Sequence, residues 1–221
     1  MVLSSVRIAF MEKKYSIPLA EIRRELVILN SRFIATLAPV FRVDEARAFI
    51  TRIKKEFADA SHNVPAYIIG GGTTVTEFCS DDGEPAGTSG KPALSVLRGS
   101  GLGDVAVMIT RYFGGTLLGT GGLVKAYTES TQMVVSAVRR GRRVEVYVMM
   151  LVIPYHLLER VRALVAQQHG KILGEDYAAD ITITFHLPVA AFDPFQNDLR
   201  ELSSGRTKAE IIETTETITA L

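Results

Sequence analysis

The chain has 221 residues, a length that allows one large domain or two small ones. Hydrophobic residues make up 47% and charged residues 22%, close to the averages of soluble globular proteins, which excludes disordered and collagen-like architectures. The net charge is only +1, so no overall basic field draws the chain to nucleic acid or anionic lipid. The single cysteine, Cys79, excludes an internal disulfide and a zinc site built from cysteines.

The sequence predicts neither a membrane-spanning helix nor a signal peptide. The longest strongly apolar run, Val146–Pro154, is far shorter than the about 20 residues that a membrane-spanning helix needs. Residues 1–10 lack the long apolar core and the cleavage site of a signal peptide. We therefore expect a cytoplasmic protein without a membrane partner. Residues 1–14 are expected to form a loose tail, with the second methionine, Met11, near the start of the folded part.

The first domain is predicted over residues 15–140, as an α+β sandwich in which helices cover one face of a sheet. The patterns predict strands over Tyr15–Leu29 and Ser31–Val40, and an amphipathic helix over Asp44–Ala58 with Asp44 as its N-cap. A near-continuous apolar run further along predicts a central, buried strand. The remaining elements expected here are strands at 66–69, 74–79 and 105–112 and helices beginning at 91 and 121.

The second domain is predicted over residues 141–221. The basic segment Arg139–Arg143 suits a link, because the charge changes sign there: residues 1–140 contain 17 Lys and Arg against 13 Asp and Glu, and the rest contain 8 against 11. Periodicity in the second part predicts the order β-α-β-β-α-β, which is ferredoxin-like, so the fold class is α+β. The expected elements are strands at 144–154, 171–177, 180–187 and 207–219 and helices at 155–169 and 189–202.

Two polar, glycine-rich segments of the first domain are candidates for function. The acidic loop, Ser80–Pro92, has the sequence SDDGEPAGTSGKP. The glycine loop, Gly114–Gly122, follows the strand end Arg111-Tyr112-Phe113 and leads into a helix. Because loops on a rigid scaffold commonly carry binding and catalytic residues, we expect function to lie in these two segments.

Three runs of sequence resemble the bacterial, YigZ-type members of the IMPACT family: SRFIA at 31–35, the acidic loop, and GSGLGDVAVMITRYFGGTLLGTGGLVKAY at 99–127. The resemblance is dense over residues 31–130 and looser beyond them. It implies a ribosomal-protein-like first domain, a fold that also occurs in elongation factor G and in small-molecule kinases. It also implies a second, ferredoxin-like domain that resembles a C-terminal domain of elongation factor G. Eukaryotic IMPACT proteins regulate translation by competing for the activator of an initiation-factor kinase, so the resemblance implies a link to translation.

Each loop has a structural interpretation beside the functional one. The acidic loop has three alternative interpretations: its Asp and Gly residues build turns, they dock a cationic partner, or they bind a divalent cation. The alternating acidic spacing of a calcium loop is missing. The glycine loop has two alternative interpretations. Because it precedes a helix, its N–H groups are placed to hold a phosphate or an RNA backbone. Alternatively, its glycines serve tight packing of the helix against the sheet. It lacks the Gly-Lys-Ser/Thr of the usual nucleotide-binding loop. Tyr112 and Phe113 stack on a base or close the core.

We predict that the two loops meet in space and form one binding surface, with Arg32 and Lys91 on its rim. The four histidines are scattered and suggest no catalytic dyad, and no cofactor, metal or catalytic residue is predicted. The predicted binding residues are Arg32, Asp81, Asp82, Glu84, Lys91, Arg111, Tyr112, Gly114, Gly115, Gly119, Gly121, Gly122 and Lys125.

Three functional hypotheses remain open. The preferred one is a translation-linked regulatory or binding protein that contacts RNA, the ribosome or a regulator protein, since no catalytic constellation is evident. The second is an enzyme that acts on a small phosphorylated or peptide substrate in a cleft between Asp81–Lys91 and Gly114–Gly122. The third is a protein-interaction scaffold whose acidic loop docks a basic partner. Sequence-specific binding to DNA is not expected.

Overall fold

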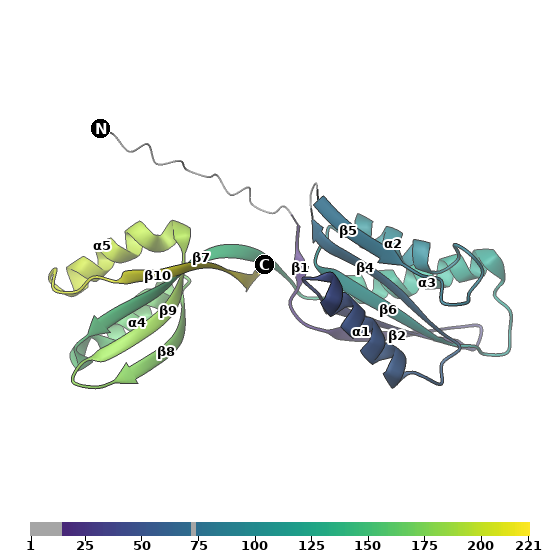
Figure 1. The fold of residues 1–221 in the computed structure, drawn as a ribbon, viewed down its shortest axis with the longest axis horizontal. Helices are drawn as coiled ribbons and strands as arrows, with labels where there is room; N and C mark the ends of the chain where they lie inside the picture. The colour runs from purple at the N-terminus through teal and green to yellow at the C-terminus, as the bar shows by residue number, and fades with distance from the viewer. Residues whose placement is uncertain (1–14, 72–73) are drawn as a thin grey trace. The chain divides into compact units, whose positions relative to one another are not determined.

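The computed structural model describes residues 15–71 and 74–221, which form two compact units (Figure 1). The first unit contains the described residues up to Arg142 together with Ala220–Leu221, and the second contains Arg143–Thr219. The chain passes from one unit to the other inside strand β7 (Arg140–Ile153), so most of the basic segment expected as a link is strand. The tail expected over residues 1–14 lies outside the described residues.

The first unit is built on an antiparallel sheet with the strand order β2-β3-β6-β4-β5. The first two of these strands pair as an antiparallel hairpin, and the predicted central, buried strand β6 is present. A short strand, β1 (Ile17–Pro18), pairs with the beginning of β7. The strands of the sheet are β2 (Ile22–Ile28), β3 (Ser31–Pro39), β4 (His62–Gly71), β5 (Thr74–Cys79) and β6 (Val105–Tyr112).

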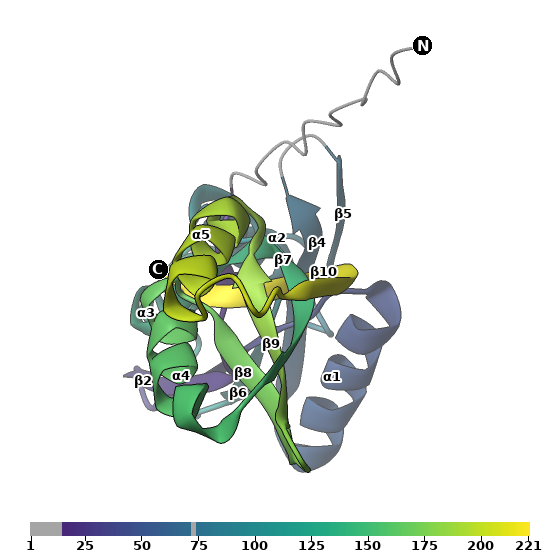
Figure 2. The same ribbon diagram turned by 90° about the vertical axis from the view of Figure 1, so that its left-hand side faces the viewer.

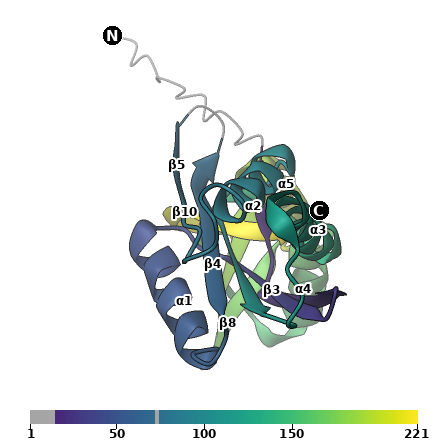
Figure 3. The ribbon, with the colours of Figure 1, turned by 90° about the vertical axis from the view of Figure 1, so that its right-hand side faces the viewer.

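Helices cover both faces of this sheet, so the prediction of helices on one face was wrong. Figure 3 shows α1 (Val43–Glu56) on one side and α2 (Gly90–Gly99) and α3 (Gly119–Ala137) on the other. Ala106 and Met108 of β6 pack with α1, whereas the alternate residues of that strand pack toward the other two helices. The continuous apolar character of β6 follows from this burial on both faces.

The predicted N-cap of α1 was also wrong. The N-cap residue is Arg42, with no side-chain capping hydrogen bond, and Asp44 lies in the first helical turn, where it pairs with Arg42. Glu45 instead accepts a hydrogen bond from the Phe41 N–H at 2.8 Å. The helix begins one residue earlier than the pattern indicates, which moves Asp44 out of the capping position.

The second unit has the predicted order β-α-β-β-α-β, and its strands lie in the order β10-β7-β9-β8. Figure 2 shows α4 and α5 on one side of these strands, where they cover a core that includes Phe185 and Phe195. The mixed α+β fold class is therefore confirmed. None of the described helices is long and apolar enough to cross a membrane. The elements are η1 (Tyr155–Leu157), α4 (Leu158–Gln167), β8 (Lys171–Tyr177), β9 (Ile181–Pro188), η2 (Val189–Ala191), α5 (Phe192–Leu202) and β10 (Glu210–Ala220).

Candidate functional site

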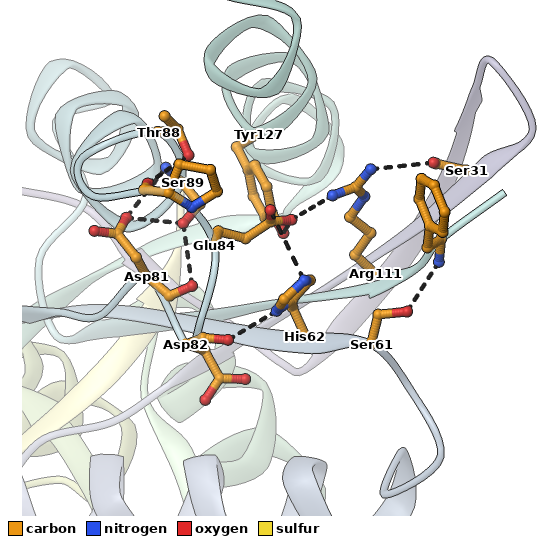
Figure 4. A network of polar contacts seen from close by, with 12 residues as sticks. Ser31, Ser61, His62, Asp81, Asp82, Glu84, Thr88, Ser89, Arg111 and Tyr127 are labelled. Carbon is orange, nitrogen blue, oxygen red and sulfur yellow. Dashed lines mark hydrogen bonds and ion pairs between the residues drawn. The ribbon is translucent and has the colours of Figure 1, made fainter. Parts of the chain in front are cut away.

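Asp81 holds the acidic loop in shape through hydrogen bonds to the loop itself (Figure 4). Its carboxylate accepts the N–H groups of Gly87 at 2.7 Å and Gly90 at 2.9 Å, and the Ser89 hydroxyl at 2.8 Å. Burial opposes ionisation of Asp81, but these hydrogen bonds outweigh burial and lower its pKa. The Asp81 side chain is therefore engaged within the loop.

Asp82 ties the acidic loop to strand β4 and helix α1. Its carboxylate accepts the N–H of Asn63 at 2.6 Å and pairs with Lys54 of α1. Its backbone carbonyl lies 2.8 Å from Nδ1 of His62. Because a carbonyl oxygen only accepts hydrogen bonds, Nδ1 of His62 must carry a proton, and Nε2 faces away from this contact.

Glu84 is buried and forms the centre of a polar network with residues from three elements (Figure 4). Its Oε1 accepts hydrogen bonds from Arg111 Nη1 at 2.7 Å and from the Tyr127 hydroxyl at 2.8 Å. Its Oε2 lies 3.8 Å from His62 Nε2. Burial, reinforced by the negative charge of Glu84, raises the pKa of Tyr127, which keeps this hydroxyl a donor.

Arg111 lies at the end of β6, where strand pairing places it opposite Phe33 of β3 and His62 of β4. Its Nη2 donates to the Ser31 hydroxyl at 3.3 Å, and its guanidinium lies over the rings of Phe33 and Phe113 at 5.4 and 5.5 Å. The residue as a whole is only 5% exposed. Arg111 is thus neutralised by Glu84 and enclosed by aromatic rings.

The acidic loop and the beginning of α3 border one cleft of about 430 Å³ in the first unit. Its ionisable groups come from the Glu84 network, and apolar side chains dominate the rest of the lining. Phe113 is 47% exposed and Leu117 is 85% exposed, so both offer apolar surface to the solvent. The lining residues are His62, Gly83, Glu84, Pro85, Arg111, Phe113, Leu117, Leu118, Gly119, Thr120 and Leu123.

The predicted charged and aromatic binding residues divide into those at the cleft and those elsewhere. Only Glu84 and Arg111 line it. Arg32 pairs with Glu25 and lies over the Tyr112 ring, and the Tyr112 hydroxyl donates to Asp59 at 2.8 Å. Lys91 is exposed on α2, and Lys125 pairs with Glu129 one turn along α3 at 3.7 Å. Neither these four side chains nor Asp81 and Asp82 belong to the cleft lining.

The predicted glycines also divide by location. Gly119 lines the cleft at the start of α3, with a φ of +70°. Gly114 serves packing, because a Cβ there would lie 2.1 Å from the backbone carbon of Asn30. Gly115 has a φ of +83°, and Gly121 and Gly122 lie in the first turn of α3 outside the lining.

Sequence reasoning missed His62 and Tyr127. Tyr127 is the last residue of the resembling run, but no spacing rule connects it to Glu84. His62 precedes Glu84 by 22 residues, and the pairing of β4 with β6 places it opposite Arg111, which bonds to Glu84. The three loop carboxylates point to three different sets of partners. Within residues 15–71 and 74–221, no group of three or more His, Cys, Asp or Glu side chains is arranged to hold a metal ion.

Comparison with known proteins agrees with this architecture. The chain matches the Impact N-terminal domain over residues 29–135 and a domain of unknown function over residues 151–206. It is 38% identical over 202 residues to the IMPACT family member YigZ of Escherichia coli (strain K12), covering 91% of this chain and 99% of that protein. It is 36% identical over 94 residues to Protein IMPACT of Xenopus laevis, covering 41% of this chain and 30% of that one.

A solved structure described as a hypothetical protein is 38% identical to the chain, with a TM-score of 0.60. The similarity covers 92% of this chain and 98% of that one. Because the similarity to YigZ and to this structure extends over both units, the relationship concerns the whole two-unit protein. The chain belongs to the IMPACT family.

Proposed function

We propose that this protein is a translation-linked binding protein that holds a regulator protein in the cleft of its first unit. Membership of the IMPACT family supports the link to translation, because the resemblance implies that eukaryotic members regulate translation through a protein partner. The Impact N-terminal domain match, residues 29–135, includes every residue of the cleft lining. The protein then acts in the cytoplasm, where translation takes place.

The observation that carries the proposal is the exposed apolar surface at the cleft. Leu117 is 85% exposed and Phe113 is 47% exposed, and both line the same concave site. Exposed apolar surface around a concavity is typical of protein-binding sites, and aromatic anchors contribute strongly to such interfaces. A partner side chain that enters the cleft would cover both residues and meet the polar Glu84 network at its base.

Charge pairing favours a protein partner over RNA at this site. Arg111, the one arginine or lysine of the cleft lining, is already neutralised by Glu84. RNA binding depends on basic side chains that are free to contact phosphates. Contact with RNA or the ribosome through this cleft is therefore the weaker form of the proposal.

The hydrogen bonds of Glu84, Asp81 and Asp82 favour a binding protein over the two alternatives, an enzyme and a scaffold that docks through the acidic loop. An enzyme needs a reactive group at the cleft, but the Glu84 carboxylate is engaged by Arg111 and Tyr127, and Lys91 lies outside the lining. A scaffold that docks through the acidic loop needs free carboxylates, but Asp81 and Asp82 bond within the unit.

Photo-crosslinking from position 117 tests the proposal. A variant with p-benzoylphenylalanine in place of Leu117 is irradiated in a translating cell extract, and the products are identified by mass spectrometry. The control carries the same group in place of Leu173, an apolar residue of the second unit that is 47% exposed. We expect position 117, and not position 173, to crosslink to a protein that acts in translation. Crosslinking to ribosomal RNA alone, or equal products from both positions, would contradict a protein partner at the cleft.

A second measurement connects the cleft to activity. Purified protein added to the same extract is expected to change the rate of protein synthesis. Leu117→Glu places a charge on the apolar surface and is expected to abolish this effect, whereas Leu173→Glu retains it. An effect that survives Leu117→Glu would separate the translation role from the cleft.

A further inference from the structure

The second unit contains a cavity of about 470 Å³ that is separate from the cleft described above. Most of its lining comes from the end of β7, the beginning of α4 and the segment between α5 and β10. The inference drawn from it does not rest on the proposed function of the first unit. The lining residues are Val152, Ile153, Pro154, His156, Leu157, Arg160, Asp180, Leu202, Ser203, Ser204, Arg206 and Thr207.

Two arginines of this lining have no partner for their charge. Arg160 and Arg206 are exposed, and in the described part of the chain no hydrogen bond or ion pair engages either side chain. Arg162, two residues further along α4, instead pairs with Glu159 and Glu175. Asp180 is the one carboxylate of the lining, so two arginines against one aspartate leave a formal charge of +1. The cavity therefore attracts an anion.

A buried hydroxyl adds a hydrogen-bond donor. Ser203 is 6% exposed, and its oxygen accepts the N–H of Thr207 at 3.3 Å. Among the described residues, no hydrogen bond uses the proton of this hydroxyl. Because Ser203 lines the cavity, this hydroxyl proton is available to an oxygen of a bound anion.

Of the two helix ends at the cavity, the beginning of α4 favours negative charge. The 3-10 turn η1 leads into α4 here, so the positive end of the α4 dipole points toward the cavity. At the end of α5, the N–H groups of Ser203 and Gly205 donate to the Leu199 and Arg200 carbonyls at 2.9 and 2.8 Å. These bonds pair two carbonyl oxygens at the C-terminal end of α5, the negative end of its dipole, and so weaken the repulsion of an anion there.

We propose that this cavity binds a phosphate group carried on a larger organic body, as in a nucleotide. Two separate guanidinium groups and a hydroxyl suit an anion with three acceptor oxygens better than a planar carboxylate. The volume exceeds that of phosphate alone, and Val152, Pro154 and Leu157 supply apolar wall for a sugar or base. The phosphate belongs either to a free phosphorylated molecule or to an RNA chain.

Titration of the full-length protein at low salt tests the site, with inorganic phosphate, uridine 5′-monophosphate and a single-stranded oligouridylate as probes. Arg160→Gln/Arg206→Gln removes both charges. Arg47→Gln/Arg200→Gln is the matched control, because it removes two exposed arginines outside the lining. We expect one or more of the probes to bind, with a Kd that rises about tenfold or more in the first variant and not in the control.

The probes distinguish the sources of the phosphate. Binding of the mononucleotide points to a free phosphorylated ligand, and binding of the oligouridylate alone points to an RNA backbone. The proposal is overturned if no probe binds, if Arg160→Gln/Arg206→Gln binds like the unchanged protein, or if the control loses as much affinity. None of these results bears on the Leu117 experiments, which probe the other unit.

Discussion

Nη1 of Arg111 donates a hydrogen bond to Oε1 of Glu84 over 2.7 Å, and this contact joins the central strand of the first unit to the acidic loop. The Glu84 and Arg111 side chains are 3% and 6% exposed. Removing one partner of a buried ion pair leaves the other charge uncompensated, whereas an exposed pair contributes little. The stability of the first unit should therefore depend strongly on this pair.

We predict that Glu84→Gln lowers the free energy of unfolding by about 3 kcal/mol or more, because Arg111 remains buried as an unpaired cation. Urea denaturation followed by circular dichroism measures the change. Glu25→Gln is the control, since it breaks the exposed pair with Arg32 and should cause a much smaller loss. Equal losses in both variants would show that burial does not strengthen the Glu84–Arg111 contact.

The hydrogen bonds of Asp81 predict that the stability of the protein depends on pH in the acidic range. Its folded-state pKa lies below the ordinary value of 3.8, so the stabilising effect is present above that value and is lost as the pH falls through the folded-state pKa. Asp81→Asn removes an acceptor and should be less stable than the unchanged protein at neutral pH. The difference should shrink as the pH falls below 3.8. Unfolding curves collected across this range test the sign, and a difference that grows on acidification would contradict the role assigned to Asp81.

Two glycines predicted as binding residues should respond differently to alanine. Gly114→Ala places a Cβ 2.1 Å from the backbone of Asn30, so the backbone must shift and stability should fall by about 1–3 kcal/mol. Gly121→Ala meets no atom within 4 Å and lies in the first turn of α3, where alanine should be neutral or stabilising. Thermal unfolding of the two variants measures both effects. A harmless Gly114→Ala would exclude the packing role.

Tyr127 predicts a loss of stability at alkaline pH. Its pKa is raised above the ordinary value of 10.0, so the stabilising effect is present below that pH and is lost as the pH rises toward the folded-state pKa. Tyr127→Phe should be about 1–2 kcal/mol less stable at neutral pH, because the hydrogen bond to Glu84 is lost. Above pH 10.0, the unchanged protein should lose stability more steeply than the variant. If the free energies of unfolding of the two proteins changed with pH in parallel, the Tyr127 hydroxyl would not belong to the Glu84 network.

Strand periodicity allowed β9 to be predicted closely. Ile181, Ile183 and Phe185 are buried, whereas Thr182 and Thr184 between them are partly exposed. Alternate side chains of a strand point to opposite faces, so a sheet that is covered on one face imposes this period of two on the sequence. The order of elements in both units followed from such local patterns.

The cleft could be predicted only in outline. The expectation that the acidic and glycine loops lie near each other agrees with the position of the cleft, but most of the predicted residues do not line it. Asp81, Asp82 and Glu84 have different partners because Asp82 and Gly83 have positive φ angles of 47° and 86°, which turn the chain sharply between them. The composition of the acidic loop alone does not reveal in which direction each of these carboxylates points.

The sequence by itself determined the types and order of the elements and the family, because hydrophobic periodicity and motif spacing are local properties of the chain. Tertiary structure alone decided that α1 lies on the opposite face from α2 and α3, and that His62 and Tyr127 meet Glu84. These contacts depend on strand pairing and helix packing between distant segments. Such pairings are selected by the free energy of the whole folded unit, and no short stretch of residues encodes them.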